Sequence, residues 1–223
     1  AFAKQPGNIP DVISLENALS QLKCLGLENP LIVTDNGYYS QSNMMEFALH
    51  NVKFLTLADP DIIWVRETVD ELREALAGMA STCPFDPTVC GASTSRMHTF
   101  SRVRQRSRNG KSAGEKETFQ RRLYVHIYYS LENEAKKELA FRRDLLELKA
   151  QIEDGIIDFT PAAQRKIEKY LTCSRQGRGG ILKVGFHDSA IAEAKKYFGY
   201  FALVSNQAID TFSALENYRL REK

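Results

Sequence analysis

The chain has 223 residues, of which 43% are hydrophobic and 26% are charged, and its formal net charge is +2 at pH 7. These values are typical of a soluble globular protein with one large domain or two small ones. No run approaches the ~20 apolar residues of a membrane span, and no charged start precedes an apolar stretch, so the sequence predicts neither a membrane helix nor a signal peptide.

Cysteine and histidine residues form no recognisable metal-binding pattern. The four cysteines are Cys24, Cys83, Cys90 and Cys173. None of their spacings is that of a zinc site, and scattered cysteines in a chain of this length indicate reduced thiols and a cytoplasmic location. The four histidines are isolated from one another in the sequence, and we expect them to be structural or exposed.

The first sixty residues predict alternating helices and strands. The expected elements are a helix over residues 11–26, a strand over 31–34, a helix from Ser40 or Ser42 to His50, and a strand over 52–57. Apolar residues recur at helical spacing in the helices, and serine is a good N-cap. A strand, a helix and a strand in succession predict a βαβ unit with a parallel strand pair.

The rest of the chain predicts a mixture of helices and strands around an irregular stretch. Helices are expected over residues 65–79, from about 130 to 154, over 160–173, over 189–197 and from Asp210 to Lys223; strands are expected over 123–129, 181–186 and 200–204. Residues 81–119 are rich in Ser, Thr, Gly, Pro and Arg and are predicted to be irregular. The class predicted for the whole chain is therefore α/β.

Asp35 directly follows the predicted strand 31–34 and begins the tripeptide Asp-Asn-Gly. This tripeptide favours a turn in any protein. Open α/β sheets also place their ligand sites at the carboxyl ends of strands, so a metal ligand is the alternative interpretation of Asp35. The spacing of residues alone leaves both interpretations open.

Basic residues are concentrated between Arg96 and Arg122. This stretch contains Arg96, Arg102, Arg104, Arg106, Arg108, Lys111, Lys116, Arg121 and Arg122. Only Glu115 and Glu117 oppose them. Such a block forms either a solvated loop or a surface that binds phosphate groups.

Several segments, in this order, resemble the DDE transposases of bacterial insertion sequences, in the subgroup with a Tyr-Arg-Glu-Lys signature. They are "PGNIPD", "LIVTDNGYYS", "KFLTLAD", "YFGYFALVSN" and "SALENYRLREK". The resemblance covers nearly the whole chain and implies a ribonuclease-H-like core interrupted by a mixed, largely helical insertion. It implies a partial core over residues 1–60, an insertion over 61–205, and over 206–223 the start of the helix that carries the catalytic glutamate.

The resemblance also implies a metal site for phosphodiester chemistry. Members of the family hold two divalent ions, Mg²⁺ or Mn²⁺, with an Asp-Asp-Glu triad, and Asp35 matches the second acid. Tyr218 and Arg221 match the first two signature residues and are expected to contact DNA phosphates. The family's first Asp precedes the "PGNIPD" segment and its Glu falls two positions beyond Lys223. We therefore expect this chain alone to be a fragment without cleavage activity.

The implied partner is double-stranded DNA at the transposon ends, bound by a homodimer in a synaptic complex near the bacterial nucleoid. The insertion is expected to contribute phosphate contacts from Arg102, Arg104, Arg106 and Arg108. Two other functions stay open. One is a truncated, inactive copy that only binds DNA or a full-length transposase, and the other is an unrelated α/β enzyme that acts on a small molecule.

Overall fold

The computed structural model describes residues 26, 30–103, 114–175 and 182–222. These residues form two compact units, one within 1–128 and 201–223 and the other within 129–200. The predicted helix over residues 11–25 lies outside the described residues. Within them, no helix is long and apolar enough to cross a membrane.

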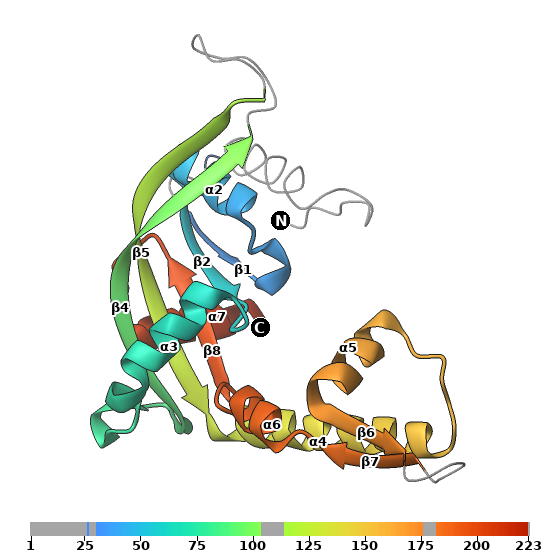
Figure 1. The fold of residues 1–223 in the computed structure, drawn as a ribbon. Coiled ribbons are helices and arrows are strands. Elements are labelled where there is room, and N and C mark those ends of the chain that lie inside the picture. Colours follow the sequence, from blue (N-terminus) through green and yellow to red (C-terminus); the bar gives the residue numbers. More distant parts are fainter. Residues whose placement is uncertain (1–25, 27–29, 104–113, 176–181, 223) are drawn as a thin grey trace. The chain divides into compact units, whose positions relative to one another are not determined.

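The first unit is built on a six-stranded mixed sheet with the order β1-β2-β8-β5-β4-β3 (Figure 1). Its strands are β1 (Leu31–Thr34), β2 (Lys53–Ala58), β3 (Thr82–Cys83), β4 (Asp86–Val103), β5 (Lys116–Ser130) and β8 (Tyr200–Ser205). β1 and β2 are parallel, as predicted for the βαβ unit, whereas β8 runs antiparallel to β2. The predicted α/β class is confirmed, since helices and a mixed sheet occur together in one unit.

The described residues of this unit form three helices: α2 (Gln41–Leu49), α3 (Ile63–Leu76) and α7 (Thr211–Arg219). Short 3₁₀ turns follow β1 (Asn36–Tyr38), α3 (Met79–Ser81) and α7 (Leu220–Glu222). The hydroxyl of Ser40 caps α2 by accepting from the amide of Asn43, and the carboxylate of Asp210 caps α7. Both caps satisfy amides that have no partner inside a helix.

The prediction that residues 81–119 are irregular is wrong, since this stretch contains β3, the whole of β4 and the start of β5. Side chains along β4 alternate between partly buried and exposed from Ala92 to Thr99, as in any half-buried strand. The inward positions, however, carry Thr94, Arg96 and His98. Their polarity hides the alternation that identifies a strand in sequence. The predicted insertion is therefore not largely helical.

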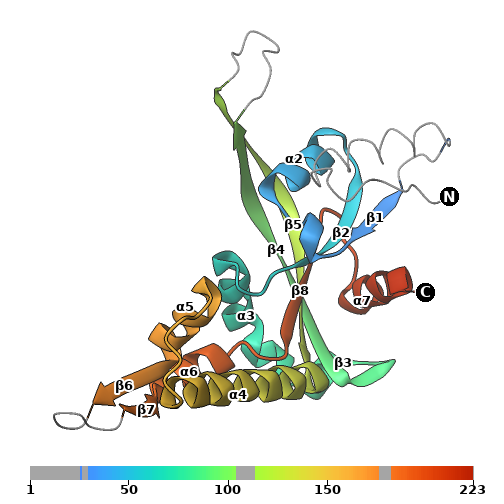
Figure 2. The ribbon, with the colours of Figure 1, turned by 90° about the vertical axis from the view of Figure 1, so that its right-hand side faces the viewer.

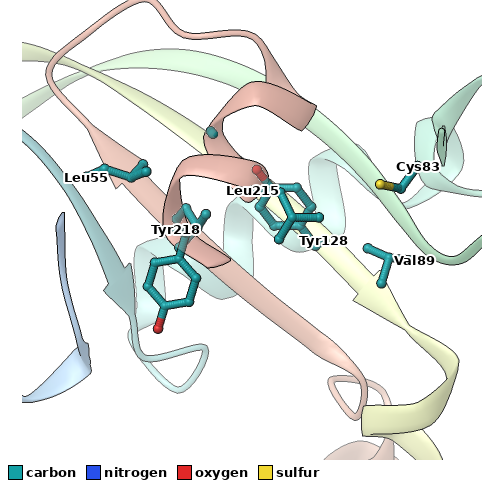
Figure 3. Close-up of a cluster of buried hydrophobic side chains, with 8 residues drawn as sticks. Leu55, Cys83, Val89, Tyr128, Leu215 and Tyr218 are labelled. Atoms are coloured by element: carbon teal, nitrogen blue, oxygen red, sulfur yellow. The ribbon is translucent and has the colours of Figure 1, made fainter. Parts of the chain in front are cut away.

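An apolar core joins α7 to the sheet (Figure 3). It consists of the buried residues Leu55, Cys83, Val89, Tyr128, Leu203, Ala214, Leu215 and Tyr218, contributed by β2, β3, β4, β5, β8 and α7. Burying one such large apolar side chain stabilises a fold by roughly 1.5–3 kcal/mol. A Cβ at Gly91 would lie 2.8 Å from Cγ2 of Thr211, so glycine lets β4 approach the start of α7.

The second unit contains α4 (Leu131–Glu153), α5 (Pro161–Tyr170), α6 (Asp188–Lys195) and the antiparallel pair β6 (Leu171–Arg175) and β7 (Leu182–Phe186) (Figure 2). The helix predicted over 160–173 ends earlier, at Tyr170. Leu171 is instead the first residue of β6 and packs with Leu148, Ile152 and Val184. Gly155, at φ +85°, ends α4 where predicted.

The predicted boundaries at residues 60 and 205 do not coincide with the limits of the two compact units. β3, β4 and β5 come from the predicted insertion, yet they continue the sheet formed by β1 and β2. The boundaries at residues 60 and 205 stay a prediction of where the insertion interrupts a ribonuclease-H-like core.

Candidate functional site

Asp35 lies at the carboxyl end of β1, where the sequence predicts a turn or a ligand site. Its carboxylate caps the 3₁₀ turn Asn36–Tyr38, and Oδ1 accepts from the amide of Asn36 at 2.7 Å. The side chain is 61% exposed. The turn and the ligand interpretation are therefore compatible, because one oxygen serves the turn while the carboxylate stays open to solvent.

The end of α7 brings Tyr218 and Arg221 to Asp35, although Tyr218 is 183 residues away in sequence. The Tyr218 hydroxyl lies 3.3 Å from Oδ1 of Asp35, and a guanidinium nitrogen of Arg221 lies 3.4 Å from the same oxygen. The guanidinium carbon of Arg221 is also 4.3 Å from the centre of the Tyr218 ring, within the range of a cation–π contact. The structure thus places three of the predicted site residues together.

Tyr218 connects this site to the apolar core. Its side chain belongs to the buried cluster, and Figure 3 shows its hydroxyl pointing away from Leu215 and Tyr128. The last helix was predicted to run to Lys223, but α7 ends at Arg219 and Arg221 lies in the following 3₁₀ turn. A 3₁₀ turn is tighter than an α-helical one, and within it Arg221 still reaches Asp35.

The three side chains form a polarised group. The backbone hydrogen bond from Asn36 has the largest effect and lowers the pKa of Asp35. Burial is the next largest effect and opposes it, while Arg221 and Tyr218 lower the pKa further. Burial raises the pKa of Tyr218. Burial alone would lower the pKa of Arg221, but Tyr218 and Asp35 outweigh it and raise the value. At neutral pH the site therefore holds an ionised carboxylate, a neutral phenol and a cation.

Polar contacts at both ends of α7 fix its position on the sheet. At its start, the Tyr128 hydroxyl donates to the carbonyl of Thr211 at 2.5 Å. At its end, a guanidinium nitrogen of Arg219 lies 2.6 Å from Oδ2 of Asp86. Sequence reasoning missed these contacts, because their partners are 83 and 133 residues apart and no local pattern marks them.

Asp35 fits the chemistry of a magnesium or manganese ligand, but the described residues do not supply a full ligand set. An exposed carboxylate is an oxygen ligand of the kind that Mg²⁺ prefers. No group of three or more His, Cys, Asp or Glu residues that could hold a metal occurs in the parts of the chain that the structure describes. A metal bound here would take one oxygen from Asp35 and others from water or phosphate.

The basic residues of the predicted DNA-binding stretch do not all have the same role. Arg104, Arg106 and Arg108 lie outside the described residues, and Arg102 belongs to β4 without a described side chain. Arg96 is used inside the fold: its guanidinium carbon is 5.2 Å from the centre of the Trp64 ring, and one nitrogen donates to the carbonyl of Trp64 at 3.1 Å. The stretch is therefore not one uniform basic surface.

Comparison with known proteins identifies no relative of this chain. No family model, no curated protein and no solved structure matches it.

Proposed function

We propose that this chain contributes the part of a DDE transposase core that holds the second acid of the triad and the Tyr-Arg pair. The observation that carries this proposal is the meeting of Tyr218 and Arg221 with Asp35 at the end of a parallel strand pair. The resemblance in sequence assigns the same three residues to one site. The parent reaction would be cleavage of a phosphodiester bond and strand transfer at the ends of an insertion sequence.

A ribonuclease-H-like arrangement of the core is part of the same proposal. Support comes from β1 and β2, which are parallel and connected through α2, and from α7, which packs against both strands. In this arrangement the sheet continues through β8 and β5 into the insertion.

In the proposed reaction, Asp35 supplies an oxygen ligand for Mg²⁺ or Mn²⁺. A bound divalent ion supplies Lewis acidity at phosphorus and activates a water or a 3′-hydroxyl. Arg221 binds a nonbridging phosphate oxygen next to Asp35, and the Tyr218 hydroxyl donates to the same phosphodiester. Burial of the Tyr218 ring holds both groups in place, because its packing in the core fixes the end of α7.

A second candidate function is a catalytically inactive protein that binds DNA or a complete transposase. The observation that favours it is that Asp35 belongs to no group of three potential metal ligands among the described residues. One carboxylate binds Mg²⁺ weakly, whereas phosphate binding by Arg221 needs no metal.

The test is binding of a fluorescent DNA duplex of about 30 base pairs, measured by anisotropy at several salt concentrations. Counterion release predicts an affinity that falls steeply with salt. Arg221→Gln should lower the affinity about threefold to tenfold and reduce the salt slope by about 1. The matched control is Arg73→Gln, whose guanidinium pairs with Asp70 at 2.8 Å on α3, and it should retain wild-type binding.

Metal dependence separates the two candidates. If the chain forms a transposase site, Mg²⁺ should raise the DNA affinity of the wild type, and Asp35→Asn should abolish that increase. DNA binding without any metal response would favour the inactive binding protein. A flat salt response, or equal effects of Arg221→Gln and Arg73→Gln, would contradict both and favour an enzyme acting on a small molecule.

A further inference from the structure

β4 has an open edge over much of its length. It pairs with β5 on one side and with β3 on the other. β3 pairs with β4 only at Asp86 and Cys90. Beyond Cys90, no strand among the described residues pairs with this edge of β4. An open edge presents backbone N–H and C=O groups at every second residue, which is a template for another strand.

A helix lies beside part of this edge and turns it into a groove. A cavity of about 340 Å³ is lined by Glu67 and Glu71 of α3 and by the β4 residues Thr94, Ser95, Arg96 and Met97. Figures 1 and 2 both show α3 next to this part of β4. Glu67 and Glu71 are one helical turn apart, so they share one face of α3. The groove therefore has a strand on one side and two carboxylates on the other.

The groove has an excess of negative charge. Among the described residues that line it, the one cation is Arg96, which is held by Trp64 and Thr68, with a hydrogen bond of 3.2 Å to the Thr68 hydroxyl. Its distance to the Glu67 carboxylate is 4.0 Å, the limit of an ion pair. Glu71 is exposed. One arginine against two carboxylates leaves a net charge of −1 for a ligand to neutralise.

Two of the features that usually prevent strands from pairing at an edge, lysine and proline, are absent from this part of β4. Natural edges are protected by lysine, proline or a projecting charge. Residues 91–101 contain no proline and no lysine, and their single charged residue, Arg96, packs against Trp64. Met97, on the rim of the groove, is 56% exposed and offers apolar contact to an incoming side chain.

We propose that this groove binds an extended peptide segment that carries basic side chains. The peptide adds to β4 along Thr94–Met97 as a new strand, so that backbone hydrogen bonds provide affinity that is independent of peptide sequence. Lysine or arginine side chains on the face toward α3 pair with Glu67 and Glu71, which provides the charge selectivity. This proposal does not depend on the DNA-binding function.

The probe is a synthetic peptide with the sequence TKVKVKVKT. It carries a fluorescent label at one end, and the other end is capped to remove its charge. We expect saturable binding by anisotropy and a change in the fluorescence of Trp64, the single tryptophan of the chain. The double variant Glu67→Gln, Glu71→Gln should weaken binding at least 10-fold. Glu74→Gln, an exposed substitution on the same helix, is the matched control and should bind as the wild type does.

Two control peptides separate strand addition from simple charge attraction. The acidic peptide TEVEVEVET should not bind, and a basic peptide with proline at its centre should bind at least 10-fold more weakly, because proline cannot donate to a strand ladder. Equal binding of the proline peptide, no saturable binding of TKVKVKVKT, or unchanged affinity in the double variant would overturn the proposal. Self-association of the chain that the double variant abolishes would also overturn it, since a second copy would then occupy the groove.

Discussion

Helices α7 and α3 both pack in the first unit, but they are attached in different ways. α7 has polar anchors at both ends, from Thr211 to Tyr128 and from Arg219 to Asp86, in addition to the apolar cluster around Leu215. α3 buries Val65 and Val69 and meets β4 through Arg96. The doubly anchored helix positions Tyr218 and Arg221 at Asp35, whereas the other leaves a groove along β4.

The attachment of each helix matches what its proposed site requires. A site made of residues 183 positions apart requires a helix that cannot slide along the sheet, and two distant polar contacts prevent such sliding. A peptide groove requires an open strand edge, and β4 has one next to α3, because β3 pairs with β4 only at Asp86 and Cys90. The predictions below test these attachments in order of expected effect.

The largest effect is expected from the apolar anchor of α7. Leu215→Ala removes a side chain that is 1% exposed, and it should lower the free energy of unfolding by about 2–5 kcal/mol, because the surrounding residues cannot fill the cavity completely. Urea denaturation measures this change. Leu220→Ala, at a side chain that is 54% exposed, is the control and should change stability by less than about 0.5 kcal/mol.

The second-largest effect is expected from acid, through the buried His126 of β5. His126 is fully buried, neither ring nitrogen has a hydrogen-bond partner among the described residues, and burial lowers its pKa to about 4 against a raising effect of Asp210. The folded state therefore disfavours protonation. The contribution of His126 to the free energy of unfolding is complete above its pKa in the unfolded chain, 6.5. This contribution, about 3 kcal/mol in total, is lost as the pH falls from 6.5 to 4.

Stability curves between pH 7 and pH 4 test this prediction. His126→Leu should flatten the curve in this window, whereas the exposed control Leu220→Ala, which changes no titratable group, should retain the wild-type slope. The carboxylates whose pKa values are lowered, such as Asp86 and Asp210, lose their contributions to stability only below the ordinary pKa of 3.8. An unchanged slope in His126→Leu would show that other groups control the acid response.

A smaller effect is expected at the C-terminal anchor of α7. Asp86 and Arg219 are partly exposed, so their coupling energy in a double-mutant cycle of Asp86→Asn and Arg219→Gln should be about 0.5–1 kcal/mol. Arg219→Gln should also weaken DNA binding if this anchor positions Arg221. Strictly additive effects on unfolding would mean that the ion pair does not stabilise the attachment.

An effect of similar size is expected at the attachment of α3. Arg96→Met removes the cation from the Trp64 ring and should lower stability by about 0.5–1 kcal/mol. Because Trp64 is the single tryptophan, its emission should shift when the contact is lost. Arg73→Met on the same helix should leave the emission unchanged.

The sequence was sufficient for the elements whose local pattern is strong. The sequence predicts the parallel pair β1–β2, a serine cap of α2 at Ser40 or Ser42, and the end of α4 at Gly155; the structure has the cap at Ser40. Each depends on residues close in sequence, such as an apolar run, a capping serine or a glycine at positive φ. The resemblance pointed to Asp35, Tyr218 and Arg221, and the structure places these three side chains in contact.

Features that depend on distant partners could not be predicted. β4 was missed because Thr94, Arg96 and His98 point inward, and their environment of Trp64 and Phe100 is visible only in three dimensions. The change from helix to strand at Leu171 follows from packing against Leu148 and Val184. The Asp86–Arg219 anchor has no local signal, because either residue alone resembles an ordinary surface charge.

The most direct test of the Asp35 site is the effect of substoichiometric Mn²⁺ on the amide NMR signals of the chain. The proposal predicts selective broadening of the signals of Asn36, Gly37 and the end of α7, and its loss in Asp35→Asn. Asp61→Asn, at another exposed carboxylate, should retain the broadening. The same selective broadening in Asp35→Asn, or no selective broadening in the wild type, would contradict the assignment of Asp35 as a metal ligand.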